Sequence, residues 1–234
     1  MARIQYCSDL HLEFPRNRAF LDKNPLEAKA DILILAGDIV PFSAMNRLTD
    51  FWDELSEKFE HTFWVPGNHE YYHSDIGDRT GEVYEEIREN IFLVNNYVTK
   101  IDNVKLIFST LWTALSETYQ FQVQRIMADF KVIQHGKTLL SPAVYNRLHL
   151  ENLEFLEKAI AGIQADEKVV VSTHHVPTFM NYPEKYRGDF LNEAFAVELF
   201  ELIADNPIDH WIFGHHHCNT PTFQIGNTDM RTNQ

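Results

Sequence analysis

The sequence contains a series of short apolar runs, most of which end in a loop that carries Asp, Asn or His. The runs are rich in Ile, Val, Leu and aromatic residues, which is typical of buried strands. They cover residues 4–7, 32–36, 62–65, 104–108, 169–172 and 211–213. Segments with helical periodicity separate them, at residues 45–59, 75–89, 116–130, 142–161 and 192–204. Strands that alternate with helices predict an α/β fold.

The start of one helix and the extent of the domain can be predicted more closely. Ser141 is a favourable N-cap residue and Pro142 suits the first helical position, so a helix is expected to begin there. The 234 residues show no linker, which predicts a single domain spanning residues 1–234. The aromatic-rich and then basic stretch at residues 112–149 is hypothesised to form a helical cap over the functional site.

Composition limits the partners and the location that the chain is expected to have. Acidic residues number 34 against 20 basic ones, a formal net charge of −14, which argues against binding nucleic acid over a broad surface. Two cysteines, Cys7 and Cys218, are too few for a disulfide framework. No secretory signal and no membrane-spanning apolar stretch are evident, so a cytoplasmic protein without a membrane partner is expected.

Five of the apolar runs are followed by candidate functional residues. In an open α/β sheet, sites form at the carboxyl ends of strands, so these loops are expected to converge. The set of polar residues after the runs comprises Asp9 and His11, then Asp38, then Asn68, His69 and Glu70, then His174 and His175, and finally His215, His216 and His217.

The residue types in these loops favour a site with two metal ions. The carboxylates of Asp9 and Asp38, one amide and at least four imidazoles suit Mn, Fe or Zn, and such a set is too large for one open catalytic ion. Two ions need a bridging group that holds them roughly 3.5–4 Å apart, and Asp38 on its Gly-Asp turn is the natural bridge. Such a pair can activate a hydroxide nucleophile. His69, beside Asn68, is placed to protonate the departing oxygen.

With these motifs in order, the chain resembles the calcineurin-like metallophosphoesterase superfamily. The pattern of that family is Asp-x-His, Gly-Asp, Gly-Asn-His-Glu, a His after a strand, and Gly-His-x-His. It stands here as Asp9/His11, Gly37-Asp38, Gly67-Asn68-His69-Glu70, His174 and His215/His217. The resemblance implies a four-layer α/β/β/α sandwich with two central mixed β-sheets.

The resemblance also implies a role for each matching residue. His174 rather than His175 is taken as the ligand, because the first His of that stretch ligates in the family. His216 is expected either directly behind the ligands or at the rim of the site. His69 is expected to be the acid or to stabilise the leaving group. The implied ligands are Asp9, His11, Asp38 and His217 for the first ion, and Asp38, Asn68, His174 and His215 for the second.

The chain departs from the family pattern after Gly37-Asp38 and at its C-terminal end. Gly37-Asp38 continues as Ile39-Val40-Pro41 and not as Asp-Arg-Gly, which argues against the protein Ser/Thr phosphatase branch. His11 is a ligand that members acting only on monoesters sometimes lack, so phosphodiester cleavage stays open. Family members often continue beyond a strand like the one expected at residues 222–226, so this end of the chain is expected to be shortened.

The leading hypothesis is therefore a dinuclear hydrolase of a small phosphomonoester or phosphodiester, with nucleotides included. A nuclease is a second hypothesis, disfavoured by the acidic balance. A non-catalytic metal-binding scaffold is a third, disfavoured because every ligand and His69 are retained. Arg187 is a candidate phosphate contact, because a guanidinium forks onto phosphate oxygens, with a surface salt bridge as the alternative. The identity of the ions, the preferred ester and the oligomeric state stay open.

Overall fold

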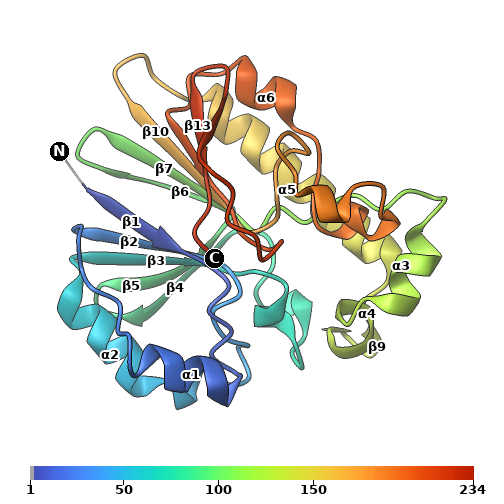
Figure 1. Ribbon diagram of the computed structural model, residues 1–234, viewed down its shortest axis with the longest axis horizontal. Helices are drawn as coiled ribbons and strands as arrows, with labels where there is room; N and C mark the ends of the chain where they lie inside the picture. Colours follow the sequence, from blue (N-terminus) through green and yellow to red (C-terminus); the bar gives the residue numbers. More distant parts are fainter. Residues whose placement is uncertain (1–2) are drawn as a thin grey trace.

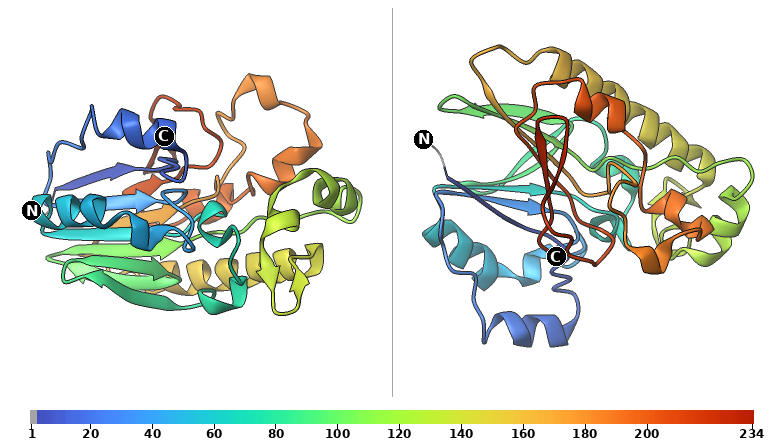
Figure 2. Two further views of the ribbon diagram at one scale, coloured as in Figure 1. Left: turned by 90° about the horizontal axis from the view of Figure 1, so that it is seen from below. Right: turned by 45° about the horizontal axis from the view of Figure 1, so that its top comes forward.

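The computed structural model describes residues 3–234 and contains two large β-sheets that face each other (Figures 1 and 2). The first sheet comprises β1 (Ile4–Cys7), β2 (Ile32–Ala36), β3 (His61–Val65), β5 (Ile91–Asn95) and β4 (Val83–Arg88), in that spatial order. The second comprises β12 (Phe223–Ile225), β13 (Thr228–Arg231), β11 (His210–Ile212), β10 (Lys168–Thr173), β7 (Val104–Ser109) and β6 (Tyr97–Ile101), also in spatial order.

Each sheet has a parallel centre; the first sheet has one antiparallel edge strand and the second has two. Strands β1, β2, β3 and β5 run parallel, and β4 pairs antiparallel with β5. Strands β7, β10, β11 and β13 run parallel, while β6 and β12 are antiparallel to their neighbours. Both sheets are therefore mixed, as expected, and the parallel strands of each sheet bring their carboxyl ends to one edge.

Helices cover the outer faces of the two sheets and complete four layers. Helix α2 (Thr49–Lys58) lies on the first sheet, with α1 (Pro15–Leu21) beside it, and α5 (Pro142–Ala161) and α6 (Phe200–Ala204) lie on the second (Figure 1). Strand β2 shows the side-chain alternation that builds these layers. Ile32 and Ile34 pack in the core between the sheets, and Leu33 and Leu35 pack under the helical layer. The predicted four-layer sandwich is confirmed.

Residues 112–149, here called the cap segment, lie beyond the carboxyl ends of the strands (Figure 1). They comprise α3 (Gln120–Ile126), α4 (Asp129–Val132), a hairpin of β8 (Gln134–His135) and β9 (Thr138–Leu139), and the start of α5. Trp112 and Phe130 belong to the same hydrophobic cluster as Leu33 of the first sheet. Short 3-10 helices are η1 (Met45–Arg47), η2 (His69–Tyr71), η3 (Ile76–Asp78), η4 (Glu184–Tyr186) and η5 (Phe190–Ala194).

The helix predicted at residues 75–89 is wrong, since the segment contains only η3 and then strand β4. Glu85 and Glu86 favour a helix by intrinsic propensity, but they lie on an edge strand of the sheet, where charged side chains are common. The helix predicted at 116–130 is interrupted between α3 and α4, and that at 192–204 is helical only in parts. The helix at 142–161 is confirmed, with Ser141 Oγ accepting a hydrogen bond from the Val144 N–H at 3.4 Å.

Among residues 3–234, no helical segment combines the length and the apolar character that a membrane span requires.

Candidate metal centre

The loops after five parallel strands bring the predicted ligands together. Asp9 follows β1, Asp38 follows β2 and Asn68 follows β3, all in the first sheet. The ligands from the second sheet are His174 after β10, and His215 and His217 after β11. The side chains form two groups that share Asp38, and each group takes residues from both sheets.

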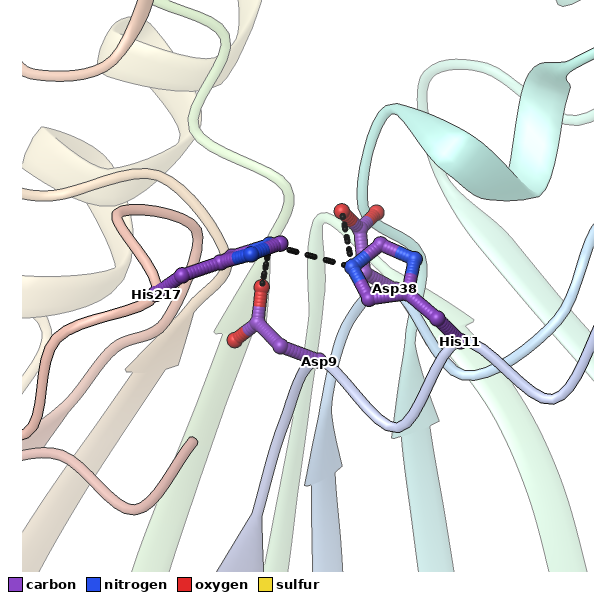
Figure 3. Close-up of side chains that lie close together, drawn as sticks. All are labelled: Asp9, His11, Asp38 and His217. Carbon is purple, nitrogen blue, oxygen red and sulfur yellow. Dashed lines mark hydrogen bonds and ion pairs between the residues drawn. The ribbon is translucent and has the colours of Figure 1, made fainter. Parts of the chain in front are cut away.

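The first group consists of Asp9, His11, Asp38 and His217, whose side chains point toward one another in Figure 3. One potential ligand atom from each residue lies within 4.8 Å of all the others. The Nε2 atoms of His11 and His217 are 3.0 Å apart, and His217 Nε2 is 3.4 Å from Asp9 Oδ1. His217 is the most exposed of the four side chains, so this group opens to solvent on its side.

The second group consists of Asp38, Asn68, His174 and His215, all buried. His174 Nε2 lies 3.0 Å from His215 Nδ1, 3.3 Å from Asn68 Oδ1 and 3.4 Å from Asp38 Oδ1. Potential ligand atoms of Asp38, Asn68 and His215 therefore lie within 3.4 Å of His174 Nε2.

Asp38 faces the two groups with different oxygen atoms. Its Oδ2 lies 3.7 Å from His11 Nε2, and its Oδ1 lies 3.4 Å from His174 Nε2. Burial alone would raise the pKa of Asp38, but the charges of His174 and His69 outweigh it and lower the pKa well below the usual range. An ionised carboxylate with one oxygen toward each group has the form of a bridging ligand.

The hydrogen bonds of the imidazoles fit bound cations. His174 Nδ1 lies 2.9 Å from the Ala36 carbonyl oxygen, and His215 Nε2 lies 3.3 Å from that of Ala194, so these two nitrogens donate. The remaining nitrogens, His174 Nε2 and His215 Nδ1, then present lone pairs to each other at 3.0 Å. Two lone pairs at hydrogen-bond distance repel unless a proton or a cation lies between them. Burial lowers the pKa of His174, but the charge of Asp38 outweighs it and raises the pKa to about 9, so a proton occupies this place in the metal-free protein. A bound metal ion would replace that proton between two neutral imidazoles.

The backbone at the site lies in the left-handed region, which non-glycine residues rarely adopt. Among the described residues, ten non-glycine residues have positive φ, and five of them are predicted ligands. Such conformations cost free energy and persist only where surrounding structure enforces them. The five are Asp9, His11, Asp38, His215 and His217, with φ between 46° and 73°.

Two motif glycines provide the space that the ligands occupy. A Cβ atom on Gly37 would lie 2.2 Å from His174 Nδ1, and Gly37 itself has a φ of +89°. A Cβ atom on Gly67 would lie 2.3 Å from Asp38 Oδ1. Real Cβ atoms do not approach other atoms this closely, so both positions require glycine.

Glu70, for which no separate role was predicted, connects the ligand loops through hydrogen bonds. Its buried carboxylate accepts five hydrogen bonds, at 2.7–3.3 Å, and those from Gly67 and Asp38 join two ligand loops. Burial and the charge of Asp38 raise the pKa of Glu70, while the backbone donors oppose that shift. The donors are the backbone N–H groups of Gly67, Asp38, Ile39 and Val40 and the Nε1–H group of Trp64.

His69 lies beside the first group, paired with an acidic residue that the sequence did not single out. Its Nδ1 atom is 3.0 Å from Glu13 Oε1, which is also 3.2 Å from His11 Nδ1. Burial lowers the pKa of His69, but the carboxylates of Asp38 and Glu13 outweigh it and raise the pKa to about 9. Burial has the opposite effect on Glu13, where it raises the pKa, but the hydrogen bonds of Glu13 with His11 and His69 outweigh it and lower the pKa to about 2.

The other candidate residues lie outside the two groups. His175 is buried, and its Nδ1–H donates to the Thr110 carbonyl oxygen at 3.1 Å. His216 is also buried, with Nδ1 2.8 Å from Gln234 Nε2. Arg187 lies on the surface, where its side chain is 76% exposed and its Nη2 atom is 2.9 Å from Glu184 Oε1. The structure does not bring Arg187 into contact with the predicted ligands.

Comparison with known proteins identifies related sequences. A family model described as calcineurin-like phosphoesterase matches residues 2–219. An uncharacterized protein, L509, of Acanthamoeba polyphaga mimivirus is 29% identical over 262 aligned positions, which cover 100% of this chain and 91% of that protein.

Two solved structures share the fold. Phosphopantetheinyl hydrolase (PptH) from Mycobacterium tuberculosis superposes with a TM-score of 0.69 at 15% identity, over 98% of this chain and 87% of that one. A dimetal phosphatase from Danio rerio gives a TM-score of 0.52 at 13% identity, over 98% and 86% of the two chains. At these identities the likeness concerns the fold.

Proposed function

The chain belongs to the calcineurin-like phosphoesterase family, and on that premise we propose that it is a dinuclear metal-dependent hydrolase of phosphate esters. The observation that carries the proposal is the position of Asp38, which presents Oδ2 to His11 and Oδ1 to His174. The proposed substrate is a small phosphomonoester or phosphodiester, with nucleotides included.

The proposed ligand sets follow the two groups of side chains. Carboxylate, amide and imidazole donors accept Mn, Fe or Zn, so each of these ions is compatible with the site. When bound, two such ions lower the pKa of water and neutralise charge on phosphoryl oxygens. Asp9, His11, Asp38 and His217 would hold one ion, and Asp38, Asn68, His174 and His215 the other.

We assign the transfer of a proton to the leaving group to His69. Its Nδ1–H donates to Glu13, so the Nε2 atom remains for the departing oxygen. Burial lowers the pKa of the ring and the carboxylates of Asp38 and Glu13 raise it; Glu13, which is not among the proposed ligands, thus favours the protonated form that donates. Glu13 would thus hold both the ring of the acid and that of the ligand His11 in place.

We propose that the substrate approaches the site along the cap segment. The cap segment and the two sheets would form a single domain. We also propose that Arg187 contacts the phosphate group of the substrate. Its ion pair with Glu184 is exposed on both sides, and pairs of that kind contribute little stability. A substrate phosphate could therefore replace Glu184 as the partner of Arg187.

The experiment is to measure hydrolysis of an aryl phosphomonoester and of the matching diester by metal-stripped protein, before and after Mn²⁺ is added. Activity that requires Mn²⁺ would support the proposal, and the ratio of the two rates would choose between monoester and diester. Faster cleavage of single-stranded nucleic acid than of either small ester would favour a nuclease. Protein that binds two ions but hydrolyses no member of a broad panel of phosphoesters would contradict the proposal and favour the scaffold.

A further inference from the structure

Asp129, in helix α4 of the cap segment, contacts the residues around the candidate metal centre. Its side chain is buried, and its Oδ1 atom accepts two hydrogen bonds. One comes from Asn68 Nδ2 at 3.0 Å and the other from the hydroxyl of Tyr72 at 2.8 Å. Its Oδ2 atom is buried without a hydrogen-bond partner in the described part of the chain.

The first of these bonds fixes the orientation of the Asn68 amide. An amide group presents an oxygen on one side and an NH₂ group on the other, and only its hydrogen bonds decide which way it points. Because Asp129 Oδ1 accepts, the NH₂ group must face Asp129. The amide oxygen then faces His174, with Oδ1 3.3 Å from His174 Nε2, as a metal ligand requires.

The second bond acts on His69 through Tyr72. The rings of His69 and Tyr72 are stacked, with centroids 4.1 Å apart and an interplanar angle of 23°. The hydroxyl of Tyr72 is tied to Asp129, so the tyrosine ring has a fixed tilt. With Glu13 bound at Nδ1, the His69 ring is restrained at one edge and on one face.

The fold does not need Asp129 to attach the cap segment. The backbone N–H of His73 donates to the Val132 carbonyl oxygen at 3.1 Å, and that of Gln134 donates to Ser74 at 3.0 Å. Phe130 adds a buried apolar contact. Burying a carboxylate is costly, and no ion pair of Asp129 occurs among the described residues, so packing alone gives no reason for it.

We propose that Asp129 is a positioning residue of the metal centre, which orients the Asn68 amide toward the second ion and holds His69 through Tyr72. This inference rests on the proposed function, because the roles of Asn68 and His69 come from it. It makes the cap segment part of the catalytic apparatus, beyond any role as a cover.

The test uses Asp129→Ala and Asp129→Asn, with Asp75→Asn as the matched control. Asp75 also joins the cap hairpin to the loop after β3, since its side chain accepts from the N–H groups of Gly136 at 2.7 Å and Gly77 at 2.9 Å. Calorimetric titration of metal-stripped protein with Mn²⁺ is the first readout. Loss of a hydrogen bond that orients a metal ligand weakens metal binding or activity about 10–100-fold.

We expect Asp129→Ala to weaken one of two Mn²⁺ sites by about that factor. Asp129→Asn should weaken it less, because its amide oxygen still accepts, and Asp75→Asn should leave it unchanged. A folded Asp129→Asn or Asp129→Ala protein that binds both ions as tightly as wild type would overturn the inference. Since this readout needs no turnover, wild-type protein that binds two ions but cleaves no ester would refute the proposed function alone.

Tyr72→Phe supplies the second readout, at saturating Mn²⁺. Loss of the hydroxyl frees the ring that is stacked on His69, so kcat should fall more for an alkyl ester, which needs the acid, than for an aryl ester. Tyr97→Phe, on strand β6, is the control. Equal kcat changes for the two esters would contradict the part of the inference that concerns His69.

Discussion

Glu13 and His69 form a close pair beside the candidate metal centre, with Glu13 Oε1 3.0 Å from His69 Nδ1. The same oxygen lies 3.2 Å from His11 Nδ1. One carboxylate therefore restrains the ring of a predicted ligand and the ring of the proposed acid. Neither ring can rotate without breaking a charge-assisted hydrogen bond.

Glu13→Gln should lower kcat by about 10–100-fold, because an amide oxygen holds two imidazoles less firmly than a carboxylate does. The loss should be larger for esters with poor leaving groups, since these depend on the acid, and KM should change little. Steady-state kinetics on alkyl and aryl esters measure this, with the exposed Glu117→Gln as control. A kcat within twofold of wild type would contradict the pairing.

Asp38→Asn should abolish activity and reduce the metal content below two ions per chain. The substitution removes the negative charge that both groups share, and we expect kcat to fall by more than about 100-fold. Elemental analysis after dialysis gives the metal content, and the exposed Asp22→Asn serves as control. A variant that keeps two ions and full activity would refute Asp38 as the bridge.

Gly37→Ala should destabilise the protein and weaken metal binding, whereas Gly188→Ala should only destabilise it. Both glycines have positive φ, at +89° and +79°, so both alanines carry strain of about 1–2 kcal/mol. Only at Gly37 would the new methyl group collide with His174, while Gly188 has no atom within 4 Å of that position. Urea unfolding and Mn²⁺ titration measure the two effects. An equal loss of Mn²⁺ affinity in the two variants would argue against a collision between the new methyl group and His174.

The metal-free protein should lose stability as the pH falls below 6.5, in part through His175. Burial and the charge of His174 lower the pKa of His175 to about 3 in the folded state, so between pH 6.5 and 3 the unfolded chain binds the extra proton. The free energy of unfolding should therefore drop by about 1.4 kcal/mol per pH unit from this residue. In urea unfolding between pH 7 and 4.5, His175→Gln should show a shallower dependence. Identical slopes would mean that His175 takes up its proton in the folded state too.

Arg187→Ala should raise KM for a small phosphoester and leave kcat nearly unchanged, if Arg187 exchanges Glu184 for the substrate. Arg3→Ala is the matched control, because Arg3 also forms an exposed ion pair, with Asp31, at the other end of β1. Saturation kinetics decide the point. An unaltered KM would show that Arg187 does not contact the substrate and only forms its surface ion pair with Glu184.

Local pattern predicted the α/β class and the loops that carry the ligands, whereas the four-layer arrangement of two sheets came from the resemblance to the family. Apolar runs followed by Asp9, Asp38, Asn68, His174 and the last His motif indicate strands and loops without reference to distant contacts. A helix was predicted where β4 lies because Glu85 and Glu86 favour a helix, whereas the pairing with β5 that fixes the extended form involves residues outside the segment.

The residues that hydrogen-bond to the candidate site residues from outside the motifs could not be predicted from the sequence. Glu13 and Asp129 look like ordinary solvated carboxylates, and they matter only because folding brings them to His69 and to Asn68. The positive φ angles of Asp9 and Asp38 likewise result from how the loops are held, which the identity of the residue does not reveal.

Because each group takes side chains from both sheets, bound ions would act as cross-links within the chain. The only two cysteines, Cys7 and Cys218, are free, so no disulfide performs that task. Asp9 and His217 are separated by almost the whole chain, and a link between such distant positions removes much freedom from the unfolded chain. The ions would then clamp the two halves of the sandwich against each other, and the protein's resistance to unfolding would depend on the same cations as its chemistry.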